Sequence, residues 1–221
     1  MFGRGRNYME KETIYIINKK MKKSNKYRYI MSGVKIFSDI ILKSTIINPA
    51  LDKQILKVLK KGEQKKEKIV KSNRGGFHSP YFKDKKIYQT LLKTSGDLIS
   101  SCLPFKGKTN VSIDNLWIMK NKKNDWNVPH THPYSNFSGI YYVKVPKKGG
   151  ELFFIRNDMA CGFSNNYLFI EDQSTHDIYS IKPEKGMLIL FPSYLLHMVA
   201  PHKENVDRIC VAFNILLKHA T

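Results

Sequence analysis

Cysteine is scarce in this chain of 221 residues. Cys102, Cys161 and Cys210 are the only three, and they lie far apart. A disulfide framework requires an even and denser set of cysteines, and a thiolate zinc site requires closely spaced pairs. The sequence therefore speaks against both and favours a reducing, intracellular setting.

Long apolar runs are also missing. No stretch approaches the roughly 18 to 20 consecutive apolar residues that a membrane-spanning helix needs. The basic N-terminus is not followed by an apolar stretch with small residues after it, as a secretory signal would be. We therefore expect no membrane segment and no secretory signal. Apolar residues nevertheless make up 42% of the chain, which indicates a folded globule.

Acidic residues are few: 18, against 38 lysines and arginines, for a net charge of +20. Half of the basic residues fall in the first 71 positions. A basic face can bind nucleic acid by releasing counterions, so a nucleic-acid-binding module remains an alternative if these lysines form one contiguous patch. The excess of lysine over arginine, with abundant Ile, Asn and Tyr, favours solvated lysines on a compositionally biased protein.

The hydrophobic pattern divides the chain into an extension and one domain. Residues 1–30 show no sustained periodicity and are predicted to be a basic, flexible N-terminal extension, while residues 31–221 form the domain. Within the domain, a strand or extended segment begins near Ile36. A helix is predicted after Asn48 and Pro49, which suit the N-cap and first turn, and a second helix spans about 83–101.

After Lys108 the pattern becomes that of short alternating strands. About seven segments, separated by turns rich in Gly, Pro, Asn and Lys, indicate a sandwich, jelly roll or barrel. We read Gly149 and Gly150 as a hairpin turn. The fold class is therefore mainly β with N-terminal helices, in which the helices back one sheet.

The last strand shows which face would meet the helices. Arg208, Cys210, Ala212 and Asn214 share one face, and the residues between them, Ile209, Val211, Phe213 and Ile215, share the other. The apolar face should pack on the helices. The mixed face should point into the barrel, where a ligand could bind.

Three histidines form a candidate metal site. His130 and His132 are one residue apart, so a strand would direct both rings to the same side, and His197 follows 65 residues after His132. Arg208, eleven residues beyond His197, is a fixed cation that suits a carboxylate. If His132 were not a ligand, Asp125 and Asp158 would be the nearest carboxylates, although neither has a ligand-like spacing. We expect His202, in a lysine-rich turn, to be solvent-exposed.

Three blocks of sequence resemble a known family. SNRGGFHS, the segment from IDNLWIMK through VPHTHPYSNFSGIYYVKVP, and KGMLILFPSYLLHMVAPHKENVDRICVAFNI are similar to the 2-oxoglutarate and Fe(II) dependent oxygenases of phages and marine bacteria, in order over residues 36–217. The resemblance implies a double-stranded β-helix, which is a jelly-roll barrel. It also implies a cytoplasmic location, that of the host if a phage encodes the protein.

The resemblance further implies a reaction and a site. His130, His132 and His197 would bind Fe(II) and act as the catalytic centre. Arg208 would pair with the distal carboxylate of 2-oxoglutarate. Tyr142 is a second candidate for binding that carboxylate, because it shares strand parity with Ser138 and would point toward the co-substrate if that face points inward. With dioxygen, oxidative decarboxylation of 2-oxoglutarate to succinate would be coupled to hydroxylation of an unidentified substrate. His-x-His replaces the usual His-x-Asp or His-x-Glu of the wider superfamily.

Two other interpretations remain open beside the nucleic-acid one. One is a jelly-roll binding or structural module without turnover, and the other is a cupin-type metal protein that uses no 2-oxoglutarate. Neither requires three histidines together with an arginine at this spacing. Substrate identity and oligomeric state do not follow from the sequence. The loop GGFHSPYF is a candidate for part of the substrate entrance, because binding residues are frequent on loops.

Overall fold

A computed structural model describes residues 39–103, 109–156 and 178–219. The described elements lie in a compact unit that begins at Ile40. The predicted extension, residues 1–30, lies outside the described residues, so its flexibility and its boundary remain predictions. The elements of the unit, in chain order, are β1 (Leu42–Thr45), α1 (Pro49–Gln64), β2 (Asn73–Arg74), β3 (Phe77–His78), α2 (Lys85–Cys102), β4 (Thr109–Asn121), β5 (Trp126–His130), β6 (Phe137–Lys144), β7 (Leu152–Ile155), β8 (Ile178–Ile181), β9 (Met187–Pro192), β10 (Leu196–Val199) and β11 (Arg208–His219).

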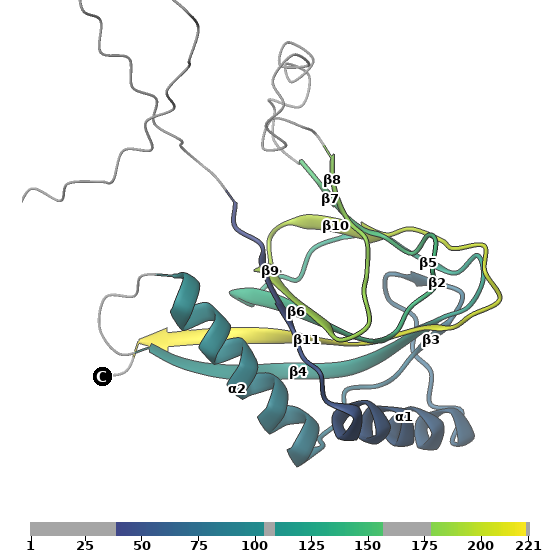
Figure 1. Ribbon diagram of the computed structural model, residues 1–221, viewed down its shortest axis with the longest axis horizontal. Coiled ribbons are helices and arrows are strands. Elements are labelled where there is room, and N and C mark those ends of the chain that lie inside the picture. The colour runs from purple at the N-terminus through teal and green to yellow at the C-terminus, as the bar shows by residue number, and fades with distance from the viewer. Residues whose placement is uncertain (1–38, 104–108, 157–177, 220–221) are drawn as a thin grey trace, which may run out of the picture. The chain divides into compact units, whose positions relative to one another are not determined.

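Two antiparallel sheets face each other in a jelly roll (Figure 1). The larger sheet has the strand order β1-β9-β6-β11-β4-β3, and the smaller has the order β2-β5-β10-β7-β8. Many successive strands alternate between the sheets, as β9, β10 and β11 do, whereas β3 pairs with β4 and β7 pairs with β8 within one sheet. The predicted fold class, mainly β with helices on one sheet, is confirmed.

Both helices begin where the sequence predicts, and both pack on the larger sheet (Figure 1). The Asn48 side chain accepts a hydrogen bond from the Leu51 amide, and Asp84 caps α2 in the same way. These caps satisfy amides that have no partner within the helix. The buried faces of the helices join the outer side of the sheet in one apolar cluster, which includes Leu51, Ile55, Leu59, Ile87, Leu91 and Ile99.

The two faces of β11 are used as the alternation predicts. Ile209, Val211, Phe213 and Ile215 belong to the cluster beneath the helices. Cys210 and Ala212 instead belong to a second cluster between the two sheets. The interior between the sheets is therefore lined by the mixed face of β11, so this strand brings polar side chains into the barrel.

Two local predictions are wrong. Gly149 and Gly150 both have positive φ, but β6 and β7 lie in different sheets, so the glycines connect two layers and do not form a hairpin. The strand expected to carry both His130 and His132 is β5, which ends at His130 and leaves His132 in the following loop. Because β5 has only five residues and contains Pro129, its sequence shows no clear alternation of apolar and polar residues.

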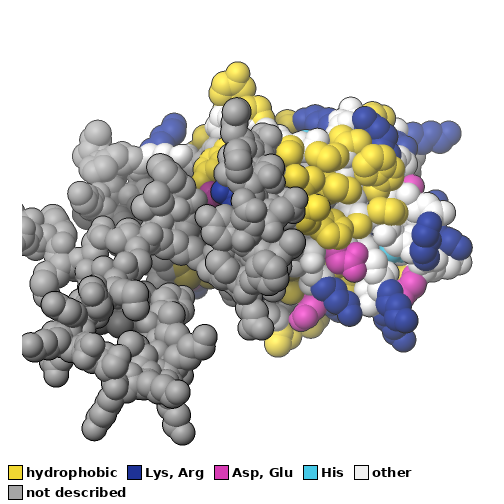
Figure 2. All heavy atoms as spheres, turned by 90° about the horizontal axis from the view of Figure 1, so that it is seen from above, with side chains coloured by type: hydrophobic (Ala, Val, Ile, Leu, Met, Phe, Trp, Pro, Cys, Tyr) yellow, Lys and Arg dark blue, Asp and Glu magenta, His cyan; other side chains and the backbone are white. Residues whose placement is uncertain are grey.

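One face of the described part of the chain carries side chains of both charges. Figure 2 looks onto one face of the molecule and shows hydrophobic side chains gathered in one area, with basic and acidic side chains interspersed around it. On the visible part of this face acidic side chains lie among the basic ones. Among the described helices, none is long and apolar enough to span a membrane.

Candidate metal centre and cavity

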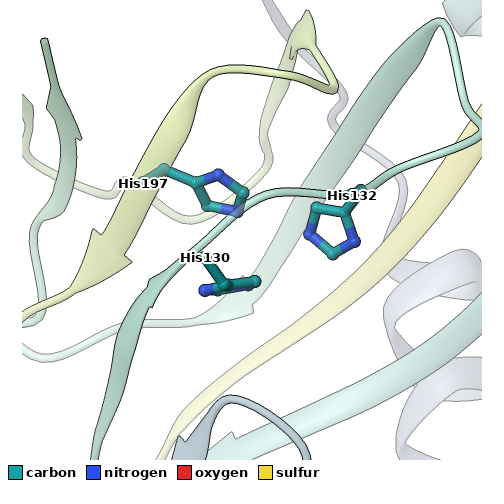
Figure 3. A group of neighbouring side chains, drawn as sticks. All are labelled: His130, His132 and His197. Atoms are coloured by element: carbon teal, nitrogen blue, oxygen red, sulfur yellow. The ribbon is translucent and has the colours of Figure 1, made fainter. Parts of the chain in front are cut away.

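Three imidazoles from two distant parts of the chain meet between the sheets (Figure 3). His130 ends β5 and lies directly opposite His197 in the β5–β10 pair. His132 reaches the same place from the loop after β5, where its amide donates to the Ser193 carbonyl. One nitrogen from each ring lies within 4.8 Å of the other two. In the described part of the chain, this is the group of side chains that could hold a metal.

Backbone carbonyls fix the protonation of two of the rings. The Nδ1 atom of His130 is 2.7 Å from the Val128 carbonyl oxygen, and that of His197 is 2.8 Å from the Leu195 oxygen. A carbonyl only accepts, so each Nδ1 must carry the proton and donate it. Each Nε2 then keeps a lone pair for a metal, which is how metal-binding histidines are usually oriented.

Burial keeps the histidines neutral. Desolvation lowers the pKa of His197 to about 3 and the pKa of His132 to about 4, and the neighbouring His130 adds repulsion to both. Desolvation also lowers the pKa of His130. Neutral imidazole is the form that coordinates a metal. All three rings are therefore ready to act as ligands at neutral pH.

Arg208 is a buried cation in the same cavity. It is 1% exposed, and no carboxylate in the described residues forms an ion pair with it. One terminal nitrogen donates to the Tyr142 hydroxyl at 3.3 Å and the other to the Cys210 sulfur at 3.8 Å, while Nε has no partner. A buried guanidinium without an anionic partner is costly. A carboxylate ligand would supply the missing charge.

Tyr142 and Ser138 occupy different surroundings. Tyr142 is fully buried against Arg208, so it orients the guanidinium and does not line the cavity. Ser138 does line the cavity, where its hydroxyl donates to the side-chain oxygen Oδ1 of Asn214 at 3.3 Å and lies 2.9 Å from the Ser193 hydroxyl. Ser138 therefore lies in a polar cluster with Ser193 and Asn214, and no contact joins it to Arg208.

The cavity that holds these groups has a volume of about 660 Å³. Its walls include the three histidines, Arg208, Ser138 and Asn214. Tyr81, from the GGFHSPYF loop, also lines it and is 50% exposed, as expected for an entrance. The volume falls within the range of small-molecule sites.

Sequence reasoning missed two aromatic walls, Trp117 and His78. Their rings are nearly parallel, with centroids 5.8 Å apart, and both line the cavity. His78 reaches this position through the pairing of β3 with β4. A strand of two residues gives no alternation, and the inward parity of β4 is the one signal that could have indicated Trp117.

Two further expectations concern His202 and Asp125. The first is wrong, and the second is answered by the structure. His202 is 1% exposed, not solvent-exposed, because Gly149 allows the chain to pack against its backbone. The Asp125 carboxylate accepts from the Lys122 amide and lies against Gly75, and it is not part of the three-histidine group. Asp158 lies outside the described residues.

The three histidines fit iron. Three neutral nitrogen ligands on one side of a metal leave positions open for a chelating co-substrate and a gas molecule, as in facial non-haem iron sites. Imidazole also suits zinc and other first-row ions. The donor set therefore fits Fe(II), and the buried Arg208 fits a diacid bound beside it.

Comparison with protein families identifies one match. The family described as "Putative 2OG-Fe(II) oxygenase" matches residues 115–214. This segment contains all three histidines, Arg208, Tyr142 and Ser138. A search of curated proteins finds no significant match.

Solved structures share the fold at low sequence identity. A Pseudomonas putida prolyl-4-hydroxylase has 13% identity and a TM-score of 0.53, covering 82% of this chain and 93% of its own. A Trichoplax adhaerens prolyl hydroxylase, in complex with a hypoxia inducible factor peptide fragment, has 15% identity and a TM-score of 0.53, covering 79% and 82%. HygX from Streptomyces hygroscopicus, with nickel, 2-oxoglutarate and hygromycin B bound, has 10% identity and a TM-score of 0.52, with coverage of 79% and 82%.

The family match and the shared fold both agree with the resemblance seen in the sequence. The phage or marine origin stays a prediction. Over residues 115–214 the chain matches the 2OG-Fe(II) oxygenase family, whose cofactors are Fe(II) and 2-oxoglutarate, and it carries that match on a double-stranded β-helix fold.

Proposed function

We propose that this protein is an Fe(II) and 2-oxoglutarate dependent dioxygenase that hydroxylates an unidentified substrate. The observation that supports this most strongly is the presence, in one cavity, of three convergent neutral histidines and a buried arginine without an acidic partner. A structural module that binds no anion would gain nothing from an unpaired buried cation. A metal protein that binds no acid beside its metal would gain nothing from it either.

Each residue has a distinct part in this proposal. His130, His132 and His197 would hold the iron, which, when bound, supplies the oxidative chemistry that converts 2-oxoglutarate and dioxygen to succinate and carbon dioxide. Arg208 would bind the remote carboxylate through its paired N–H groups. Tyr142 would hold the guanidinium in position. Ser138 would shape the wall beside Asn214.

The substrate is proposed only by class. Two of the structural neighbours are prolyl hydroxylases, and one of them binds a peptide fragment. A polypeptide is therefore the first substrate class to test here. Tyr81 and the fully exposed Tyr134 flank the cavity and offer apolar contacts for such a chain.

Succinate formation tests the proposal without knowledge of the substrate. The protein with Fe(II), 2-oxoglutarate and dioxygen should produce succinate, and the anaerobic mixture should show a weak visible charge-transfer band. His197→Ala should abolish metal uptake. Arg208→Gln should retain the metal but bind 2-oxoglutarate about 100-fold more weakly, since charge-assisted hydrogen bonds contribute about 1.5–3 kcal/mol each.

Matched variants separate this function from its alternatives. Lys93→Gln removes a surface charge on α2, outside the cavity, and should change neither binding step. Metal binding without any succinate or charge-transfer band would favour a metal protein that does not use 2-oxoglutarate. Unchanged 2-oxoglutarate affinity in Arg208→Gln would contradict the role given to this arginine.

A further inference from the structure

A row of polar side chains crosses the inner face of the larger sheet at the end away from Arg208. Asn214 of β11 lies in register with Asn115 of β4 on one side and with Ser138 of β6 on the other, and all three line the cavity. Along β11, Asn214 is six residues from Arg208, a separation of about 20 Å in an extended strand. A five-carbon diacid held by Arg208 therefore does not reach this row.

The metal centre lies close to the row. Trp117 follows Asn115 on the inward face of β4, and its ring centroid is 5.6 Å from that of His132. On the other flank, Phe191 of β9 has its ring centroid 4.7 Å from that of His197. A molecule that contacts the row therefore brings its neighbouring atoms to the three histidines.

Fixed contacts decide which atoms of the two side-chain amides stay open. The Asn214 oxygen accepts from the Ser138 hydroxyl, which lies 2.9 Å from that of Ser193. The amino group of Asn214 has no partner among the described residues, although the side chain is only 7% exposed. The amino group of Asn115 donates to Asp114, which leaves the Asn115 oxygen open in the described part of the chain. The row thus presents one donor beside one acceptor.

We propose that Asn214 and Asn115 set the substrate specificity by binding one residue of an extended peptide, with Asn214 donating to its C=O and Asn115 accepting from its N–H. This rests on the proposed function. The N–H and C=O of one residue in an extended chain point to the same edge. Side chains on facing strand residues start about 5 Å apart, which suits such a pair of groups. The buried amino group of Asn214 gains the acceptor that it lacks.

The charges around the row favour a neutral chain over a polyanion. Asp114 is exposed and lines the cavity beside Asn115, so the row continues to the surface at a carboxylate. At the mouth, the Lys71 ammonium donates to the Tyr81 hydroxyl. A nucleobase edge could also offer a donor beside an acceptor, but its phosphates would meet Asp114 without the several basic partners that a phosphate backbone needs.

Ligand-observed NMR tests the subsite on the protein loaded with Zn(II) and 2-oxoglutarate, which does not turn over. The probe is N-acetylalanine N-methylamide, and its matched analogue has an ester oxygen in place of the alanine N–H. The probe should bind, and the analogue should bind about 5-fold more weakly, because it lacks the donor for Asn115. In Asn115→Leu this difference should disappear. Asn214→Asp, which replaces a donor with an acceptor, should weaken binding of the probe about 10-fold.

Asn110→Asp is the matched control, because Asn110 lies on the same strand, is exposed and does not line the cavity. It should bind both molecules as the unaltered protein does. The comparison of probe and analogue on the unaltered protein depends on the folding of no variant. Equal binding of the two, or unchanged binding of the probe in Asn214→Asp, would overturn the inference.

Other ligand classes and the succinate assay complete the test. Binding of propionamide or cytidine in preference to the probe would overturn the assignment to a peptide. Succinate formation without any binding of the probe would overturn this inference alone. Absence of succinate would instead overturn the proposed function.

Discussion

At the scale of single residues, the site depends on where protons are held. The Val128 and Leu195 carbonyls bind the Nδ1 protons of His130 and His197, and burial resists a second proton on either ring. Both effects preserve the Nε2 lone pairs. The metal-free protein therefore contains histidines that are poor bases, because their surroundings disfavour charge.

This arrangement predicts a pH-dependent stability in the metal-free protein. Folded, His132 and His197 stay neutral down to pH about 4 and about 3, whereas in the unfolded chain they take up protons near pH 6.5. The unfolded state then binds more protons, so the free energy of unfolding should fall as the pH drops below about 6.5. The expected loss between pH 7 and pH 5 is roughly 2 kcal/mol for each ring.

Urea unfolding of the metal-free protein at pH 7, 6 and 5 measures this loss. His197→Phe should have a shallower dependence on pH, because one of the buried bases is gone. A free energy of unfolding that stays constant over this range would show that the rings accept protons in the folded state.

The site residues differ in how far the sequence could reveal them. The spacing of His130, His132 and His197 suggested a common ion, and the position of Arg208 at the start of an alternating strand suggested its inward direction. His78 depends on the pairing of β3 with β4, which has no local sequence signal, and Trp117 is placed by the pairing of β4 with β11. Their place in the site needed the fold.

At the scale of elements, close packing between β6 and β11 depends on Gly139. A Cβ built on Gly139 would lie 2.3 Å from the Phe213 ring, which is fully buried beneath the helices. The neighbouring Tyr141 hydroxyl donates to Asp52 at 2.7 Å and so ties β6 to α1. The ring of Phe213 has little room to move, and β6 carries Ser138 and Tyr142.

We therefore predict opposite effects for two glycine substitutions. Gly139→Ala should lower the free energy of unfolding by about 1–3 kcal/mol, because overpacking displaces Phe213. Gly96→Ala, in α2, should raise it by about 0.5–1 kcal/mol, because open space surrounds that position and alanine favours a helix. Denaturant unfolding checks both. Equal effects of the two substitutions would contradict the packing seen at Gly139.

The predictable elements were those with strong local patterns. The cap at Asn48, the apolar stripes of both helices and the alternation of β11 led to correct predictions. The end of β5 and the strands of two residues were not predicted, since pairing with distant partners defines them. The glycine pair at 149 and 150 indicated a turn but not the sheets that it connects, because sheet membership is a tertiary property.

At the scale of the whole molecule, the metal site joins distant parts of the chain. His130 and His132 lie more than 60 residues before His197, and the ligands come together only in the folded state. A metal that binds this arrangement should stabilise the native protein by mass action. The unfolded chain cannot present the same three nitrogens.

Metal addition and removal should therefore shift the melting temperature reversibly. Co(II) at about 100 times its dissociation constant should add about 2.7 kcal/mol of stability, enough to raise the melting temperature by several degrees in a chain of this size. A chelator should reverse the shift. His197→Ala should show none, and an equal shift in that variant would indicate that the ion binds elsewhere.

The mixed construction of the three-histidine group has a kinetic consequence. Hydrogen-bonded strands hold His130 and His197 opposite each other, whereas His132 is carried by a loop. We therefore expect an ion to bind first to the two strand-held rings, which form a preorganised bidentate site, and then to the ring of His132. We also expect substitutions that weaken the hydrogen bond between the His132 amide and the Ser193 carbonyl to speed dissociation of the ion more than changes elsewhere in the loop.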